Sequence, residues 1–358
     1  MKKEINLKDI LKQFAVEAAV EPYGNGHIND TYCLRSSRCI LQRINTGIFK
    51  NPDELMENIE NVTAFLRKKI QEAGGDPERE TLTVLKTVDG KNCYRYDEDN
   101  VFRMYLFVEN TKSIENSKTP EDLCEAGVGF GHFQKMLADY PADTLHESIR
   151  DFHHTPKRVE ALREAIREDR AGRAESVKAE IDFALEQAVW ADTVIRGIED
   201  GRIPLRVTHN DTKINNILFD RESGKAVCVI DLDTVMPGSM LYDFGDALRM
   251  GGSTAAEDET DLEKVWFDEK AFEAFAKGYL SEVRETLTET ELKLLPFSVK
   301  LMTYECGIRF LTDYLNGDTY FKIHREHHNL DRARNQFKLV EDIAAKEAEL
   351  MELVSRMV

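Results

Sequence analysis

The sequence lacks several features that would assign it to a large class of proteins. Its six cysteines show no CxxC spacing, which argues against a metal-binding or redox pair, and their scatter is typical of reduced thiols in a cytoplasmic protein. No stretch approaches the roughly 20 apolar residues that a membrane span needs. The N-terminal segment returns to charged residues every few positions and has no small-residue cleavage site. We therefore expect a cytoplasmic protein with no secretory signal and no membrane partner.

The chain also lacks any excess of basic residues. Its 48 Lys and Arg residues against 66 Asp and Glu residues give a formal net charge of −18 at pH 7. Such a charge repels nucleic acid, so we expect no nucleic-acid partner. What is present, 42% hydrophobic and 32% charged residues in a chain of 358, is ordinary for a globular protein and long enough for two lobes.

Two regions of different character follow one another along the chain. The first hundred residues alternate β-like runs, such as "CILQRI" and "VFRMYLFV", with one helix at 51–75, for which Asn51 is the expected N-cap and Pro52 the first helical residue. From about Asn110 the chain is mainly helical, with expected helices after two Thr-Pro pairs and at 178–198, 268–284, 289–315 and 330–356.

This order of elements predicts an α+β fold with two lobes. We expect a small β-rich N-terminal lobe at 1–109 and a larger, mainly helical C-terminal lobe at 110–358.

A short β-rich stretch between the helices carries the most informative motif. In "LRVTHNDTKINNILFD" (205–220), His209, Asp211 and Asn216 fit the pattern H-x-D-x-x-x-x-N of phosphotransferases. Phosphoryl transfer to an alcohol needs a carboxylate that takes the hydroxyl proton, which Asp211 supplies, and oxygen ligands for Mg²⁺, which Asn216 supplies. An isolated HxD is more often a turn with a side-chain hydrogen bond, so the motif needs support from its surroundings.

That support comes from the next apolar run, "AVCVI" (226–230). It is typical of a buried strand, and it ends in Asp231, which places a second oxygen ligand at the tip of the strand. Lys213, two positions beyond the predicted base, carries a positive charge suited to the transferred phosphoryl group.

The tripeptide Asp243-Phe244-Gly245 looks like the magnesium-binding motif of protein kinases. However, Asp231 already occupies the metal position after a strand, whereas Asp243 follows the turn-like "PGSMLY" and opens a helix-like segment. We expect Asp243 to cap this helix and to bind backbone N–H groups of the catalytic loop.

The expected nucleotide contacts lie near the N-terminus. Gly24 and Gly26 in "EPYGNGHINDTY", with Asn29 beside them, allow backbone N–H groups to approach phosphates, although an Asn-Gly hairpin turn is the simpler explanation. The strand "RMYLFVEN" runs into the linker between the lobes, where we expect backbone groups of Phe107 and Val108 to bind adenine.

These segments resemble the aminoglycoside phosphotransferase/choline kinase superfamily of small-molecule kinases, which share the protein-kinase-like fold. The resemblance spans almost the whole chain, and it is greatest to the N-acetylhexosamine 1-kinases within the superfamily. It is densest in "EPYGNGHINDTY", "PLRVTHNDTKINNIL", "IDLDTVMPGSMLYDFGDALR" and "LPFSVKLMTYECGIRFLTDYLNGDTYF".

The resemblance implies that the chain transfers a phosphoryl group from ATP to C1 of N-acetylglucosamine or N-acetylgalactosamine. Asp211 is then the base, and Asn216 and Asp231 bind Mg²⁺, with Asp233 as an accessory ligand or a supporting group. The implied sugar ligands are His27, Asp246, Arg309 and Tyr320. Each has a simpler alternative: Arg309 as an i,i+4 partner of Glu305, Tyr320 as packed core, and His27 as a loop residue bound to its own backbone.

One departure from the protein-kinase pattern concerns the strand "CILQRIN". A lysine for the phosphates is expected here, and Gln42 and Arg43 stand in its place. Alternation puts these two on opposite faces, so only one can face the nucleotide. Either Arg43 replaces the lysine after a register shift, or Lys213 and the metal carry the charge.

Two other functions remain open from the sequence. One is another kinase of the superfamily, acting on an aminoglycoside, choline or homoserine, although Arg309 argues against a cationic substrate. The other is a sugar-binding protein without turnover, against which the complete set of catalytic residues argues. The oligomeric state is not indicated, and we favour a monomer because the final helix at 330–356 suits packing on the body of the protein.

Overall fold

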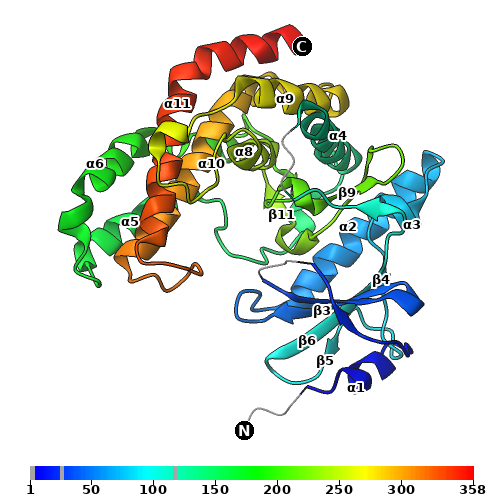
Figure 1. The fold of residues 1–358 in the computed structure, drawn as a ribbon. Coiled ribbons are helices and arrows are strands. Elements are labelled where there is room, and N and C mark those ends of the chain that lie inside the picture. Colours follow the sequence, from blue (N-terminus) through cyan, green and yellow to red (C-terminus); the bar gives the residue numbers. More distant parts are fainter. Residues whose placement is uncertain (1–4, 25–27, 116–118) are drawn as a thin grey trace. The chain divides into compact units, whose positions relative to one another are not determined.

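The structure, a computed structural model, describes residues 5–24, 28–115 and 119–358. Two compact units make up the chain: unit 1 comprises Met1–Ile114, Asp139–Arg150 and Asn216–Pro237, and unit 2 comprises Glu115–Ala138, Asp151–Asn215 and Gly238–Val358. Unit 1 holds the main sheet and unit 2 most of the helices (Figure 1), which confirms the predicted α+β class. Unit 1 includes two segments beyond residue 110, and the predicted division of roles between the lobes stays a prediction.

An antiparallel sheet forms the centre of unit 1. Its strands run in the order β1-β2-β3-β6-β4, and β5 also pairs with β6. The two longest strands, β3 and β6, are rich in aliphatic and aromatic residues and pair in unbroken register, with Gln42 opposite Arg103. The strands are β1 (Glu21–Pro22), β2 (Asp30–Leu34), β3 (Cys39–Asn45), β4 (Val84–Leu85), β5 (Tyr94–Arg95) and β6 (Asn100–Leu106).

The two faces of this sheet meet different helices because side chains alternate along each strand. Leu41 and Met104 are buried against α1 (Leu7–Lys12). Arg103 points to the opposite face, where its Nη1 lies 3.9 Å from Sδ of Met56 in α2 (Pro52–Glu72). This helix begins at Pro52 as predicted, but the Asn51 side chain forms no capping hydrogen bond.

A second antiparallel sheet in unit 1 brings two predicted site residues together. The hairpin of β9 and β10 pairs Ile217 with Val229, and the Ile230 N–H donates to the Asn216 carbonyl at 2.9 Å. Asn216, just before β9, therefore lies beside the chain that leads into Asp231 after β10. The elements here are α3 (Pro77–Glu80), β7 (Thr111–Lys112), β9 (Ile217–Asp220) and β10 (Ala226–Val229), in the sheet order β10-β9-β7.

Unit 2 is built around two helices, α8 and α10, which pack on one another. α4 packs on α9, and α10 also contacts α5 and α11 (Figure 1). None of the helices in the ranges described above is both long and apolar enough to cross a membrane. The helices are α4 (Pro120–Met136), α5 (Thr155–Glu168), α6 (Lys178–Gln187), α7 (Thr193–Glu199), α8 (Met240–Gly251), α9 (Glu269–Val283), α10 (Glu289–Leu315) and α11 (His328–Met357); two further short strands are β8 (Arg206–Thr208) and β11 (Met236–Gly238).

Most of the predicted helices are confirmed, with ends that lie within two residues of the prediction. Two predictions need correction. The helix expected at 178–198 is broken into α6 and α7, because the chain turns at Ala188–Trp190 and the Trp190 ring packs on Phe297 and Tyr304. The second Thr-Pro pair does not supply its own cap: Thr155 is the first residue of α5, and the His154 side chain accepts the capping hydrogen bond from the Lys157 N–H.

Glycines allow α4 and α9 to approach until their backbones touch. A Cβ atom on Gly127 of α4 would overlap the Phe275 carbonyl of α9, and one on Gly278 of α9 would overlap the Cys124 carbonyl of α4. Any side chain at these positions would push the two helices apart.

We predict that Gly127→Ala lowers the free energy of unfolding by about 1–3 kcal/mol, the usual cost of overpacking a core. Thermal unfolding followed by circular dichroism measures this. Gly251→Ala is the matched control, since its Cβ would meet only Cδ2 of the flexible Leu123 side chain, at 3.1 Å. Equal melting temperatures for wild type and Gly127→Ala would contradict the close contact.

Candidate active site

The loop after β8 presents Asp211, the predicted base, in unit 2. Asn210 has a left-handed backbone (φ +66°), which asparagine tolerates better than most residues. The Asp211 carboxylate is paired with Lys213, with 2.7 Å between Oδ1 and Nζ. Burial alone would lower the pKa of Lys213, but the charges of Asp211 and Asp246 raise it above its ordinary value. Lys213 is therefore positively charged throughout the neutral range.

Asp243 of α8 fixes the backbone of this loop. Its buried carboxylate accepts hydrogen bonds from the N–H groups of His209 (2.9 Å) and Asn210 (2.7 Å). Burial raises the pKa of Asp243, while the nearby His209 and these two N–H groups act in the opposite direction. The predicted bond to the catalytic loop is confirmed, but Asp243 is not the helix cap, because Ser239 accepts the capping hydrogen bond from the Leu241 N–H.

His153 contacts a backbone carbonyl group of the same loop. Its Nδ1 lies 2.7 Å from Oε1 of Glu305, and its Nε2 lies 3.2 Å from the Asn210 carbonyl oxygen. Both ring nitrogens therefore lie within hydrogen-bonding distance of an oxygen atom. Glu305 also accepts from the Thr155 hydroxyl at 2.6 Å. Burial would raise the pKa of Glu305, but the charge and hydrogen bond of His153 hold it below its ordinary value.

Unit 1 carries the two predicted metal ligands, Asn216 and Asp231, side by side at the ends of β9 and β10. Asp231 adopts a left-handed backbone (φ +59°) that turns the chain away from the strand. An amide oxygen and a carboxylate are hard oxygen donors of the kind that Mg²⁺ takes, usually with substrate phosphates as further ligands. Across the described ranges, no group of three or more His, Cys, Asp or Glu side chains suits a metal ion. The donor set therefore fits Mg²⁺ that is bound together with a nucleotide.

Asp233, the third predicted metal residue, is buried and engaged by other side chains of unit 1. Arg103 forms an ion pair with Oδ1, and the Asn29 amide donates to Oδ2 at 2.6 Å. Both of its carboxylate oxygens thus face nitrogen donors of the protein.

The strand β3 shows no register shift, so Arg43 does not move into the position of the expected lysine. Arg43 instead pairs with Asp30, with 2.7 Å between Nε and Oδ2. Gln42 lies on the opposite face and accepts a hydrogen bond from Nε of Arg103 at 3.0 Å. The positive charge beside Gln42 is therefore that of Arg103, from the neighbouring strand.

The predicted nucleotide-binding turn is described only in part. Gly24 has φ +73°, a conformation that favours glycine, whereas Gly26 and His27 lie outside the described residues. In the linker after β6, the Phe107 N–H donates to the Arg38 carbonyl and the Val108 carbonyl accepts from the Thr111 hydroxyl, each at 2.8 Å.

Two further backbone groups of this linker bear on the predicted adenine site. Within 5–24, 28–115 and 119–358, the Phe107 carbonyl and the Val108 N–H form no hydrogen bond. Both belong to one trans peptide unit and point in opposite directions, so one edge of a ligand can meet only one of them.

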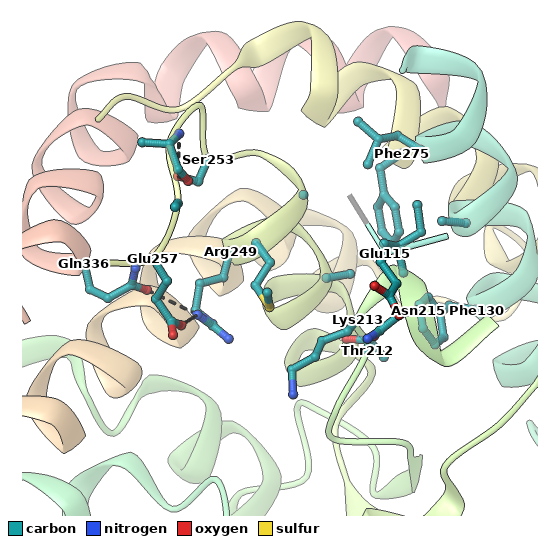
Figure 2. Close-up of a pocket in the computed structure, with 18 residues that line it drawn as sticks. Glu115, Phe130, Thr212, Lys213, Asn215, Arg249, Ser253, Glu257, Phe275 and Gln336 are labelled. Atoms are coloured by element: carbon teal, nitrogen blue, oxygen red, sulfur yellow. Dashed lines mark hydrogen bonds and ion pairs between the residues drawn. The ribbon is translucent and has the colours of Figure 1, made fainter. Parts of the chain in front are cut away.

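A cavity of about 220 Å³ lies within unit 2, beside the catalytic loop. Figure 2 shows Lys213 and Arg249 extending their charged ends into it, with Glu257 next to Arg249 and the rings of Phe130 and Phe275 along another part of the wall. The cavity thus combines an apolar wall with paired charges, which is the usual make-up of a small-molecule site.

Two carboxylates near this cavity share one cation of the protein. Arg249 donates from Nε to Asp246 (3.1 Å) and from Nη1 to Glu257 (2.7 Å), and the Thr212 N–H donates to Asp246 at 3.2 Å. Burial would raise the pKa of Asp246, but Arg249 and Lys213 lower it overall. Asp246 is therefore ionised, and it shares Arg249 with Glu257.

Arg309 and Tyr320 lie elsewhere in unit 2. The Arg309 guanidinium is stacked over two rings, those of Phe152 and Phe321, each with a centroid 5.6 Å away. No ion pair joins Arg309 to Glu305 in the described part of the chain, so the simple helix pair is not what holds it. Tyr320 is 63% exposed, which contradicts the packed-core alternative.

Three residues with buried or paired side chains were not predicted from the sequence: Arg103, Arg249 and His153. Arg103 could have been noticed, since it is a lone charge in the apolar run "VFRMYLFV". Arg249 stands three residues after Asp246 on a predicted helix, a spacing at which side chains meet. His153 gave none, because its partner Glu305 is 152 residues away.

This architecture is shared with solved structures of small-molecule kinases. A microcompartment-associated aminopropanol kinase superposes with a TM-score of 0.65 at 17% identity, over 96% of this chain and 97% of that one. An aminoglycoside phosphotransferase from Alicyclobacillus acidocaldarius gives 0.62 at 13%, over 99% and 98%. A spectinomycin phosphotransferase in complex with ADP and spectinomycin gives 0.56 at 13%, over 99% of each chain.

The sequence itself assigns the chain to a family. Residues 19–287 match the model of the phosphotransferase enzyme family, and they include Asp211, Asn216 and Asp231. The chain belongs to this family.

The His153–Glu305 pair makes a pH-dependent contribution to stability. The pKa of Glu305 is lower in the folded protein than its ordinary value of 4.5. Its contribution is therefore complete above about pH 4.5 and is lost as the pH falls through the lower folded pKa. We predict that Glu305→Gln lowers the free energy of unfolding by about 1–3 kcal/mol at pH 7.

Denaturant unfolding from pH 7 to pH 3.5 checks this, and the difference between wild type and Glu305→Gln should shrink below about pH 4.5. Glu341→Gln is the control, because that carboxylate is exposed and its ion pair with Lys338 is long, at 3.6 Å. A Glu305→Gln difference that stays constant over the whole pH range would argue against an ionised, paired Glu305.

Proposed function

We propose that the chain is an ATP- and Mg²⁺-dependent kinase that phosphorylates N-acetylglucosamine or N-acetylgalactosamine at the anomeric hydroxyl. The products are ADP and the sugar 1-phosphate. The observation that carries the proposal is a braced loop bearing Asp211 and Lys213, beside a cavity where Arg249 pairs with Asp246 and Glu257. Membership of the phosphotransferase family supports the reaction, and the mixture of donors and acceptors beside the cavity suits the hydroxyls of a sugar.

In this reaction Asp211 takes the proton of the acceptor hydroxyl as its oxygen bonds to the γ-phosphorus. The bond from that phosphorus to the bridging oxygen breaks, and ADP leaves. Lys213 stabilises the negative charge of the transferred phosphoryl group. Asn216 and Asp231 hold Mg²⁺, which when bound offsets the charge of the phosphate oxygens.

The proposed nucleotide contacts are made by residues of unit 1. Gly24 and Gly26 accommodate the phosphates, Asn29 acts through its bonds to Asn45 and Asp233, and the Val108 N–H donates to a ring nitrogen of adenine. The ADP in the similar spectinomycin phosphotransferase structure supports an adenine nucleotide. Gln42 and Arg43, which already have partners in the sheet, are not required for this role.

The proposal of an uncharged acceptor rests on the hydrogen-bonding groups beside the cavity. Arg249 pairs with both Asp246 and Glu257, and Lys213 pairs with Asp211, so three carboxylates share two cations. An ammonium group placed here would be attracted by the carboxylates and repelled by the two cations, so the charges alone do not select one. Sugar hydroxyls, in contrast, can donate to the carboxylates and accept from the cations at the same time.

The proposed sugar ligands are His27, Asp246, Arg309 and Tyr320. Asp246 binds a hydroxyl while keeping its bonds to Thr212 and Arg249, because a carboxylate has about four acceptor sites. Arg309, braced by two aromatic rings, and the exposed Tyr320 supply donors to the ring and acetamido oxygens.

The principal alternative is a kinase of the same family with another acceptor. The similar structures include an aminopropanol kinase and a spectinomycin phosphotransferase, and choline, homoserine or an aminoglycoside would suit the net charge of −18. A sugar-binding protein without turnover is a third possibility, against which Asp211, Asn216, Asp231 and Lys213 together argue.

We expect Asp211→Asn to reduce kcat by at least about a hundredfold, because it removes the positioned base while keeping the shape of the side chain. A coupled assay for ADP release, with N-acetylglucosamine as acceptor, measures this, and calorimetry checks that ADP still binds. Asp200→Asn, which changes an exposed carboxylate paired with Arg202, should leave turnover unchanged. Turnover by Asp211→Asn close to that of wild type would rule out Asp211 as the base.

The same assay with different acceptors tests the substrate class. We expect kcat/KM for an N-acetylhexosamine to exceed that for choline or kanamycin by at least about a hundredfold, the discrimination that a polar site typically achieves. A higher value for choline or kanamycin would leave the family and catalytic loop in place and overturn the sugar site.

Arg309→Ala tests, in the same assay, whether Arg309 binds the sugar and not the nucleotide. The loss of one charged hydrogen bond should raise KM for the N-acetylhexosamine by about tenfold and leave KM for ATP unchanged. An unchanged sugar KM would remove Arg309 from the acceptor site.

A further inference from the structure

Arg103 is a buried cation in the middle of the sheet of unit 1. Its side chain is 1% exposed, its Nε donates to Gln42 at 3.0 Å, and its guanidinium lies 5.2 Å from the centroid of the Tyr105 ring. Burial opposes the charge, but Asp233 raises the pKa of Arg103 above its ordinary value. A cation buried this completely needs a fixed anion as its partner.

Asp233 is that anion, and it belongs to the turn that directly follows Asp231. Its side chain is 4% exposed, with Oδ1 paired with Arg103 and Oδ2 accepting from the Asn29 amide at 2.6 Å. The Asp233 carbonyl also accepts from the Ser148 hydroxyl at 2.9 Å. The turn at Leu232–Thr234 is therefore held through both its side chain and its backbone.

Asn29 connects this turn to the end of β3. It stands between Gly24 and the start of β2, and its Oδ1 accepts from the Asn45 N–H at the end of β3 at 3.0 Å. One amide side chain thus bridges β3 and Asp233, using its acceptor for the first and its donor for the second.

We propose that Arg103 and Asn29 are positioning residues that act through Asp233: they fix the turn that follows Asp231 and tie it to the end of β3, and so set the affinity for a magnesium-bound nucleotide. Asp233 is then an anchor, and Asp231 alone of the two presents its carboxylate to the metal. The inference rests on the proposed function, in which Asp231 and the glycine segment bind Mg-ATP.

This arrangement accounts for the missing lysine of β3. The cation of this sheet is supplied by β6, one strand away and directly opposite Gln42. It is too deeply buried to approach a phosphate, so its charge is used on Asp233, and Gln42 links the two strands by accepting from Arg103.

Asn29→Ala tests the bridge with little risk to folding, because Asn29 is only partly buried. Titration calorimetry of purified full-length protein with ADP is performed once with Mg²⁺ and once with EDTA. The variant should bind Mg-ADP about tenfold more weakly, the loss expected for one hydrogen bond to a charged group, and should bind metal-free ADP within about twofold of wild type.

Arg103→Lys keeps the charge but loses the bond to Gln42, and Arg103→Met loses both. We expect graded losses of Mg-ADP affinity, smaller for lysine and larger for methionine. Arg95→Met is the matched control on the neighbouring strand β5, since Arg95 is exposed and paired with Asp53 at 3.1 Å. It should bind Mg-ADP like wild type. If Arg103→Met does not fold, Asn29→Ala and Arg103→Lys decide the question.

Wild-type affinity for Mg-ADP in folded Asn29→Ala and Arg103→Lys would overturn the proposal. An equal loss with and without Mg²⁺ would also overturn it, because that result indicates a merely structural role. No Mg-ADP binding by the wild type would overturn both this inference and the nucleotide part of the proposed function. The expected losses in a protein that phosphorylates no N-acetylhexosamine would support the positioning role and refute only the acceptor.

Discussion

The loop that carries the predicted base depends on one buried carboxylate, that of Asp243. Buried N–H groups of an irregular loop need acceptors, and Asp243 supplies one for His209 and one for Asn210. Asp243 is itself buried, as is every residue of α8 from 240 to 249. His153 contacts the Asn210 carbonyl, so both polar groups of the Asn210 backbone have a partner just before Asp211. The predicted base is thus placed by its neighbours before any substrate binds, which is the condition for efficient proton transfer.

Charge pairing is the second constraint, and it makes the candidate site differ in charge from the protein as a whole. The chain has a formal net charge of −18, yet Asp211 and Asp246 are each paired with a cation of the protein. In unit 1 the buried Asp233 is paired with Arg103 in the same way. Because charges at the surface are screened by salt more strongly than buried pairs, the groups at the site and not the net charge bear on the acceptor. A site that mixes cations with carboxylates suits a neutral polyhydroxyl substrate, whose hydroxyls can bind to both.

The sequence predicted what depends on neighbours along the chain. The helix that begins at Pro52 follows from a proline at the first helical position, and the strand that leads into Asp231 follows from a continuous apolar run. The bond from Asp243 to the loop follows from its place after a turn instead of a strand. The sequence could not predict which distant groups meet. Arg103 pairs with Asp233 only because β6 lies beside β3 and the turn after β10 is folded against that face, and no local pattern encodes this. The break between α6 and α7 was also missed, because packing of Trp190 overrides helix propensity there.

Phosphorus NMR of the reaction product tests the central claim most directly. The purified protein is incubated with Mg-ATP and N-acetylglucosamine, and the product spectrum is recorded with coupling to the attached sugar proton. The account predicts a new phosphomonoester whose phosphorus couples to the anomeric proton, together with stoichiometric ADP. A phosphomonoester coupled to the protons of C6, or no phosphoryl transfer to the sugar at all, would contradict an anomeric sugar kinase.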